Sequence, residues 1–254
     1  MIKLENVTKK YGDLTVFKDF SIEFKENETT AILGASGVGK TTILNMLAGI
    51  TDCDEGKIFT ENKVSYVFQT PNLIENLSVF KNIEIVLKGE NKNKAEREKI
   101  IDEFLVAAGI YEKKYSPVYS LSGGQKQRVG IIRAFCYPSE LLLTDEPFSS
   151  LDILLKMRLI DLYADLLQKK PRTAVLVSHS ESEAIALADK IVVLGANRIA
   201  DDFYVDDLRC DGSETGECKT GESKTIDKAR PRDESSYCFS AARKRILDCL
   251  KLQK

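Results

Sequence analysis

The sequence predicts an α/β fold with a mainly parallel sheet, an N-terminal antiparallel β subdomain and a helical insertion. Three observations support this fold class. Short apolar runs at 29–33, 141–145 and 173–178 alternate with helical stretches, as buried parallel strands do. Two stretches near the N-terminus alternate apolar and polar residues, which is typical of half-exposed strands. A charge-rich block from about 78 to 106 has helical periodicity and no clear strand.

Length and composition place the chain among globular proteins. Its 254 residues can form one large or two small domains, and 43% of them are apolar. The formal net charge of −2 provides no general attraction to nucleic acid or to an anionic membrane. No apolar run approaches the roughly 20 residues that span a bilayer, and the N-terminus does not resemble a signal peptide, so we expect a cytosolic protein. The six cysteines form no Cys-x-x-Cys pair, and Cys53 and Cys136 are expected to be plain thiols.

The segment from Gly34 to Thr41 fits the P-loop spacing, in which a glycine and four residues precede Gly-Lys-Thr. An apolar strand at 29–33 precedes it and a helix at 42–48 follows, so the positive helix end would face bound phosphates. Lys40 can reach the β- and γ-phosphates, and the Thr41 hydroxyl can bind Mg²⁺. We therefore predict a P-loop NTPase core. Its expected nucleotide-binding residues are Gly34, Ala35, Ser36, Gly37, Val38, Gly39, Lys40, Thr41 and Thr42.

The N-terminal stretches at 2–7 and 16–24 are expected to pair as antiparallel strands, with a turn at 11–13. Tyr11 lies at this turn. It could stack on a nucleotide base or be an ordinary sheet residue, and the sequence favours neither. Two further short strands are expected at 56–60 and 64–68.

The charge-rich block predicts two helices. One runs from an N-cap at Ser78 to Leu87, and the other covers 94–105. The charge run at 92–99 is most simply a solvated face. The inward side of the second helix is expected to carry Ile100, Ile101, Phe104 and Leu105.

Polar residues recur where the later strands and helices begin or end. Ser122 and two glycines open a long helix and leave N–H groups for a phosphate, although Ser-Gly-Gly alone is more often a loop. Asp145 and Glu146 follow a buried strand, where an open α/β sheet has its ligand crevice. His179, the sole histidine, directly follows another buried strand and is a better functional candidate than an average histidine.

The tail differs in composition from the rest. The last core strand is expected at 191–194, a polar, mobile linker at 206–237 and a C-terminal helix at 238–254. Ser240 would be the helix N-cap. The apolar face of that helix would be Ile246, Leu247 and Leu250.

Together these motifs resemble the ATPase subunits of ATP-binding cassette (ABC) transporters over about residues 2–205. Gly34–Thr41 resembles Walker A, and 142–146 resembles Walker B with its adjoining glutamate. Residues 121–125 look like the signature sequence and 150–152 like the D-loop. Gln69, His179 and Tyr11 are placed like the Q-loop glutamine, the switch histidine and the adenine-stacking aromatic of the family.

The resemblance implies roles for these residues. Glu146 would be the general base for the attacking water, and His179 would contact the γ-phosphate. Mg²⁺ would be held by Thr41, Gln69 and Asp145. The ATP bound on the other subunit of a head-to-tail dimer would meet Ser122, Gly123, Gly124 and Gln125. The implied domains are a nucleotide-binding core at 1–69 and 121–205 and a helical subdomain at 70–120.

The resemblance also implies the partners. They are a second ATPase subunit, a separate integral membrane permease and, indirectly, an extracytoplasmic solute-binding protein, with the chain peripheral on the inner face of the cell membrane. Residues 145–152 look like those of bacterial importers, and Leu73, 77–79 and Asn82 resemble the nitrate, sulfonate and taurine group. The segment at 229–233 also resembles that importer group. The chain departs from the group at Glu75-Asn76, where Pro-Trp is common. Leu73 and Ile74 are expected at the permease contact, the alternative being that they only pack the helical insertion against the core.

Two other classes of function compete with this one. A non-transport ABC ATPase acting on DNA or ribosomes would need a long coiled coil or a second cassette. The 82 positions from Lys40 to Ser122 leave no room for a coiled coil, and the net charge argues against nucleic acid. A binding module with a dead site would lack the general base and the switch histidine, and this chain has Glu146 and His179.

Overall fold

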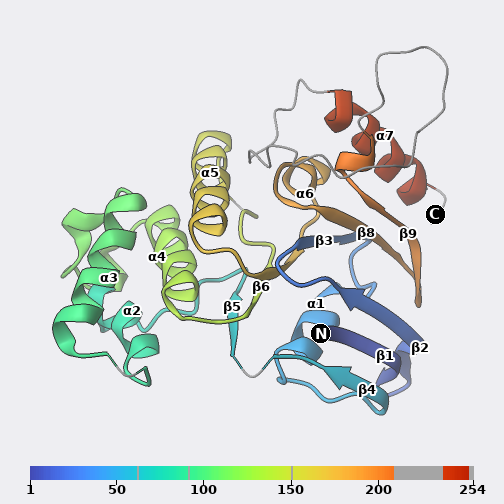
Figure 1. Ribbon diagram of the computed structural model, residues 1–254, viewed down its shortest axis with the longest axis horizontal. Coiled ribbons are helices and arrows are strands. Elements are labelled where there is room, and N and C mark those ends of the chain that lie inside the picture. Colours follow the sequence, from blue (N-terminus) through green and yellow to red (C-terminus); the bar gives the residue numbers. More distant parts are fainter. Residues whose placement is uncertain (62, 91, 150, 209–236, 252–254) are drawn as a thin grey trace. The chain divides into compact units, whose positions relative to one another are not determined.

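The computed structural model describes residues 1–254 except 62, 91, 150, 209–236 and 252–254 (Figure 1). The chain forms two compact units: the first comprises Met1–Phe59 and Val175–Lys254, and the second Thr60–Ala174. These units do not follow the expected domain boundaries, and the division into core, helical subdomain and tail stays a prediction. None of the helices in the described ranges is long and apolar enough to cross a membrane.

The first unit contains an antiparallel sheet in the order β2(Leu14–Phe24), β1(Ile2–Tyr11) and β4(Glu55–Phe59). The alternation predicted for the first two strands is visible in their burial: Ile2, Leu4 and Val7 are buried on β1, and Phe20, Ile22 and Phe24 on β2. The sequence predicted β4 as a strand but not that it would complete this sheet. The antiparallel N-terminal subdomain is thus confirmed.

Parallel strands carry the P-loop in the same unit. β3(Thr29–Gly34) is buried throughout and pairs in parallel with β8(Lys190–Gly195), and α1(Lys40–Leu47) follows the loop. β8 pairs antiparallel with β9(Arg198–Tyr204), which the sequence had not indicated because its acidic residues interrupt the apolar pattern. The expected last core strand is therefore followed by one more. α6(Glu181–Leu187) and a 3₁₀ turn, η3(Asp206–Leu208), complete this part.

The C-terminal helix α7(Tyr237–Lys251) belongs to the first unit and begins three residues before the predicted cap at Ser240. It lies beside α6 and β8 (Figure 1). Phe239, Ala242 and Ile246 are buried in one cluster with residues of α6, β8 and β9. Leu247, expected on the apolar face, is 37% exposed. The earlier start has a physical reason, because Phe239 extends the buried face by one turn. The linker predicted at 206–237 lies outside the described residues from 209 to 236.

The second unit is mostly helical. β5(Val64–Val67) and β6(Leu141–Asp145) pair in parallel, and β7(Thr173–Val177) crosses the boundary between the units. The described helices of this unit are α2(Val79–Leu87), α3(Lys94–Ala107), α4(Gly123–Cys136) and α5(Ile153–Lys169), with 3₁₀ turns η1(Tyr111–Lys113) and η2(Val118–Ser120). Ser78 caps α2 and Ser122 caps α4 as predicted, whereas α5 was not foreseen.

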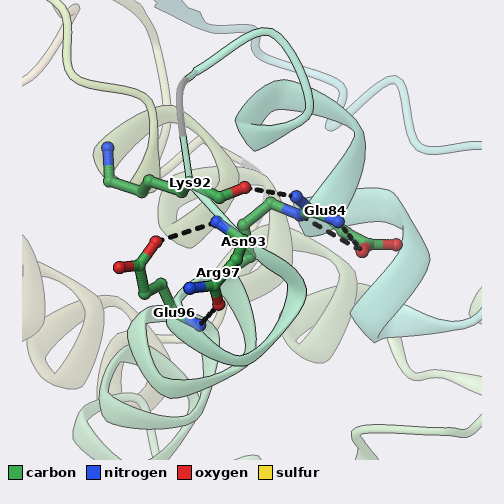
Figure 2. Close-up of polar contacts among 5 residues, drawn as sticks. All are labelled: Glu84, Lys92, Asn93, Glu96 and Arg97. Atoms are coloured by element: carbon green, nitrogen blue, oxygen red, sulfur yellow. Dashed lines mark hydrogen bonds and ion pairs between the residues drawn. The ribbon is translucent and has the colours of Figure 1, made fainter.

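The junction of α2 and α3 is held by the residues expected to form a solvated face (Figure 2). Asn93 and Glu96 form a capping box at the start of α3. Arg97 donates to the Lys92 carbonyl at 2.7 Å and pairs with Glu84 of α2 at 3.2 Å, and both paired side chains are mostly buried. The prediction of a simply solvated run is therefore wrong for Arg97. Inside α3, Ile101, Phe104 and Leu105 are buried, and Ile100 is only half-buried.

Candidate active site

The P-loop joins β3 to α1 in the first unit. The Lys40 ammonium group folds back into the loop, where it donates to the carbonyl oxygens of Gly34 and Ala35 at 2.9 Å each. Gly39, the N-cap of α1, has a φ of 106°, and a Cβ there would lie 2.5 Å from Cζ of Phe17. Only glycine fits this position, and it has no side chain to cap the helix. No side chain caps the start of α1, and its first turn can therefore face an anion.

His179 is held near the same strand edge. It lies two residues after the end of β7, beyond Ser178, and is exposed. Its neighbour Ser178 donates a backbone hydrogen bond to Ile32 of β3 at 3.3 Å, two residues before the P-loop begins. The Ser178 hydroxyl also donates to the Glu183 carboxylate at 2.6 Å and accepts from the Ser180 N–H at 2.9 Å. The turn that carries His179 is thus fixed to the strand that carries the P-loop.

Tyr11 ends β1 and pairs with Leu14 across the predicted turn. Its side chain is 47% exposed, with the Lys9 ammonium 5.3 Å from the ring centroid. The exposed face agrees with base stacking, and the place in the hairpin agrees with an ordinary sheet residue.

The acidic pair lies in the second unit at the end of β6. The Tyr66 hydroxyl donates to Asp145 at 3.5 Å. Burial, together with the charge of Asp145, raises the pKa of the Tyr66 phenol, so this hydroxyl keeps its proton near neutral pH. Glu146 has a φ of 45°, in the left-handed region that costs an ordinary residue about 1–2 kcal/mol. Such strain recurs at functional sites, where the surrounding structure holds it in place.

A short turn from Glu146 to Ser149 connects the acids with Gln69. The Ser149 N–H and hydroxyl both donate to the Glu146 carbonyl, at 3.2 and 2.9 Å. The Gln69 side-chain amide donates to Ser149 Oγ at 3.2 Å and to Glu146 Oε2 at 3.4 Å. The structure therefore brings the side chains of Gln69 and Glu146 together. It also adds Ser149, which the sequence had not singled out.

The signature-like segment opens α4. Ser122 and Gln125 form a capping box, with bonds of 3.0 and 3.3 Å, and Ser122 and Gly123 are exposed. Gly124 is buried where a Cβ would lie 2.2 Å from Cδ2 of Leu155, so a side chain there would displace α5 or Leu155. Gln127, one turn further on, donates from its buried amide to the Pro147 carbonyl at 2.6 Å. This bond ties α4 to the turn of Glu146.

The structure describes two of the three residues that resemble the D-loop, Leu151 and Asp152. Ser150 lies outside the described residues. Asp152 is the N-cap of α5, and its carboxylate accepts from the Leu155 N–H at 3.0 Å.

The residues expected to bind Mg²⁺ carry oxygen donor atoms. Among the described residues, no three His, Cys, Asp or Glu side chains gather into a metal-binding group. Mg²⁺ does not need one, since it takes one or two carboxylates together with phosphate oxygens and water. The hydroxyl of Thr41, the amide oxygen of Gln69 and the carboxylate of Asp145 are all oxygen ligands of the kind Mg²⁺ prefers.

Comparison with known proteins agrees with this geometry. The family model "ABC transporter" matches residues 17–149. The chain is 38% identical over 205 residues to the aliphatic sulfonates import ATP-binding protein SsuB 2 of Pseudomonas savastanoi pv. phaseolicola, covering 81% of this chain and 75% of that protein. It is 35% identical to the Fe(3+) ions import ATP-binding protein FbpC of Fusobacterium nucleatum, covering 76% and 55%. The chain belongs to the ABC transporter ATP-binding family and is an ATPase.

Solved structures give the same result. The ATP-binding cassette MJ0796, solved as a dimer in a post-hydrolysis state bound to ADP and Pi, matches with a TM-score of 0.72 and 29% identity, covering 80% of this chain and 98% of that one. CbiO1 of Clostridium perfringens, part of the ABC transporter complex cbiONQ, matches with a TM-score of 0.71 and 26% identity, covering 79% and 87%. The predicted fold class is thereby confirmed.

Proposed function

We propose that this chain is the ATP-hydrolysing subunit of a bacterial importer of the sulfonate, nitrate or taurine type. The observation that carries the proposal is the Glu146 turn, in which a strained acid follows Asp145 and contacts Gln69. The kinship with SsuB, an aliphatic sulfonate import protein, supports the substrate group. The relatives reported above act in import or transport, and the non-transport alternative gains no support from them.

In this proposal the P-loop holds the nucleotide. The first-turn N–H groups of α1 and the Lys40 ammonium bind phosphate oxygens, so Lys40 exchanges its two carbonyl partners for phosphate. His179 contacts the γ-phosphate, and Tyr11 is a candidate for stacking on the base. Mg²⁺, when bound by Thr41, Gln69 and Asp145, neutralises charge on the phosphates.

Glu146 is the general base in this proposal. Its carboxylate accepts a proton from the attacking water while the surrounding turn keeps it in one position. Phosphoryl transfer depends mainly on positioning and electrostatic stabilisation. A residue held by Gln69 and by the bonds of its own turn suits that demand.

The proposed assembly has two copies of this chain and a permease. A second copy would place Ser122, Gly123, Gly124 and Gln125 at the nucleotide of its partner. The dimeric state of MJ0796 supports the presence of a second copy. An integral membrane permease would bind the ATPase at the inner face of the membrane, and an extracytoplasmic solute-binding protein would deliver the solute. The predicted helical subdomain at 70–120, called the helical block below, carries the proposed permease contact at Leu73 and Ile74.

The Glu146→Gln variant tests the proposed base. The amide keeps the size of the side chain but cannot take a proton, so turnover is expected to fall about 10²–10⁴-fold. ATP binding should persist, because the P-loop is unchanged. Phosphate release and nucleotide binding on the purified chain measure the two effects.

Glu140→Gln is the matched control, since Glu140 is an exposed acid immediately before the first residue of β6, whereas Glu146 immediately follows the last. It should hydrolyse ATP at the wild-type rate. Wild-type turnover in Glu146→Gln would remove Glu146 from the role of base.

A further inference from the structure

The hydroxyl of Ser149 lies between two residues of the proposed site. Its oxygen is 2.9 Å from the carbonyl oxygen of Glu146 and 3.2 Å from Nε2 of Gln69. Gln69 and Ser149 are 80 positions apart in the chain, so the contact is made by the fold and not by local sequence.

The direction of each bond follows from counting protons. A serine hydroxyl has one proton, and a carbonyl oxygen can only accept. The Ser149 hydroxyl therefore donates its hydrogen bond to the backbone carbonyl of Glu146. The hydroxyl oxygen accepts a hydrogen bond from the Gln69 amide. The Nε2 group of Gln69 faces the turn and also reaches Glu146 Oε2 at 3.4 Å. Its carbonyl oxygen, Oε1, is then left on the other arm of the amide, available to a cation.

The turn that carries Ser149 is held in place from outside. The Gln127 amide of α4 donates to the Pro147 carbonyl at 2.6 Å, and both Pro147 and Phe148 are buried. The Ser149 N–H and hydroxyl both bond the carbonyl of Glu146 and so help to hold the Glu146 backbone in its left-handed conformation. Ser149 is thus a hydrogen-bond acceptor in a fixed position. By accepting from the exposed Gln69 amide, it fixes the orientation of an amide that could otherwise rotate.

We infer that Ser149 is a positioning residue for ATP hydrolysis. It fixes which end of the Gln69 amide faces the metal and holds the backbone of Glu146. This inference rests on the proposed roles of Gln69 and Glu146. Without the hydroxyl, the Gln69 amide loses its anchored partner and can turn its NH₂ group toward the cation, which repels it.

Ser149→Ala tests the inference in the purified full-length chain. Turnover is expected to fall about 10–100-fold, as when an outer-shell partner of a metal ligand is removed. ATP affinity without metal should stay within about twofold, since the P-loop carries it. The gain in ATP affinity on adding Mg²⁺ should be largely lost, and this binding readout is independent of catalysis.

Three further variants separate positioning from folding. Ser149→Thr keeps the hydroxyl and should restore most of the turnover and the Mg²⁺ effect. Ser149→Cys keeps the size of the side chain with a weaker donor, so its turnover and Mg²⁺ effect should lie between those of the Thr and Ala variants. It provides a second test of the inference if Ser149→Ala lowers the melting temperature. Ser21→Ala is the matched control, because the Ser21 hydroxyl also donates to a neighbour, Asn6, at 3.1 Å in the antiparallel sheet. It should behave as wild type.

A double-mutant cycle with Gln69→Ala decides whether Ser149 acts through Gln69. If it does, Ser149→Ala should weaken the Mg²⁺ effect no further once Gln69 is Ala. If the two substitutions instead weaken the Mg²⁺ effect independently, so that their losses multiply in the double variant, the inference is overturned. Wild-type behaviour of Ser149→Ala would overturn it as well. Wild-type turnover in both Gln69→Ala and Glu146→Gln would instead overturn the proposed site itself, so the two failures are distinguishable.

Discussion

Asn82 shows how one buried side chain fixes the backbone of a neighbouring loop. It is fully buried, and its Oδ1 accepts from the Ile74 N–H at 2.8 Å. Its Nδ2 group lies 3.0 Å from the Ile74 carbonyl and 3.1 Å from the Ser78 carbonyl. Buried polar groups are costly unless they are paired in this way. The backbone of Ile74 is therefore held while its side chain stays 46% exposed.

This geometry separates two roles for Ile74. An apolar side chain that packs the helical block would be buried, whereas an exposed one on a fixed backbone is available to a partner. We predict that Ile74→Glu folds and hydrolyses ATP normally but fails to co-purify with the permease. The affinity loss should be at least about tenfold, because burying an unpaired carboxylate costs several kcal/mol. Co-purification and thermal melting measure the two effects.

Ile85→Glu is a matched control for that experiment. Ile85 lies on α2 of the same unit and is 47% exposed, so the substitution changes charge and exposed area alike. It should retain the permease. An Ile74→Glu chain that unfolds would place Ile74 in the packing of the helical block and move the permease contact elsewhere.

At this scale the sequence revealed the residues whose neighbours are close in the chain. The P-loop, the acidic pair and the capping box of Ser122 are defined by spacings of a few residues, so their chemistry is legible in the sequence. Tyr66, Gln127 and Ser149 were missed because their partners are 20 to 80 positions away. The one available signal for Ser149 was its place in the same short turn as Glu146.

Among the elements, α7 is held to the first unit by both packing and charge. Arg245 donates twice to Asp201 of β9, at 2.6 and 2.7 Å, and its guanidinium lies 4.4 Å from the Phe203 ring centroid. The hydrogen bonds from Arg245 outweigh the opposing effect of burial and lower the pKa of Asp201. The fork geometry of arginine favours such a two-point contact with a carboxylate.

The lowered pKa of Asp201 predicts a pH-dependent contribution to stability. A carboxyl whose pKa is lower when folded contributes stability that is full above its unfolded pKa, near 3.8, and lost as pH falls through the folded value. Arg245→Gln should therefore lower the free energy of unfolding by about 1 kcal/mol at pH 7, a modest value because the pair is partly exposed. The difference should shrink in acid, below the ordinary aspartate pKa. Thermal melts of both chains at several pH values measure it.

Arg243→Gln is the internal comparison, since Arg243 makes one contact with Glu181, at 3.2 Å, and is more exposed. It should cost less at pH 7. A pH-independent effect of Arg245→Gln would mean that packing on Phe203, and not the ion pair, holds the helix.

Elements were predictable where their hydrophobic pattern was simple. β3, β6, β7 and β8 are buried along their length and appear in the sequence as apolar runs. α5 was missed because its first turns expose Ile153 at 78%, Leu154 at 70% and Met157 at 59%, so no polar outer face marks it as a helix. β9 was missed because Asp201 and Asp202 interrupt it, and its pairing with β8 supplies what its own composition does not.

For the whole molecule, the proposed dimer concerns a surface of the second unit. The exposed N-cap Ser122 lies at the start of α4. Gly124, two residues after Ser122, packs against Leu155 of α5. Ile153 and Leu154, at the start of the same helix as Leu155, are exposed apolar side chains. Exposed apolar side chains near an exposed helix N-terminus suit a second protein surface that brings a phosphate with it.

The dimer can be tested with two side chains of equal size at Ser122, in a Glu146→Gln background that retains ATP. Aspartate and asparagine both cap helices as well as serine does, so α4 should stay intact in either variant. They differ in charge. If the partner's phosphates lie at Ser122, the Asp side chain repels them by about 1–4 kcal/mol at 4 Å, depending on the local dielectric. Ser122→Asp should therefore need about 10–1,000 times more ATP to dimerise, whereas Ser122→Asn should dimerise near the wild-type ATP concentration. Light scattering across an ATP titration measures the shift, and equal melting temperatures show that the cap is preserved. Equal dimerisation of the two variants would place the phosphates away from Ser122, even if a dimer still forms.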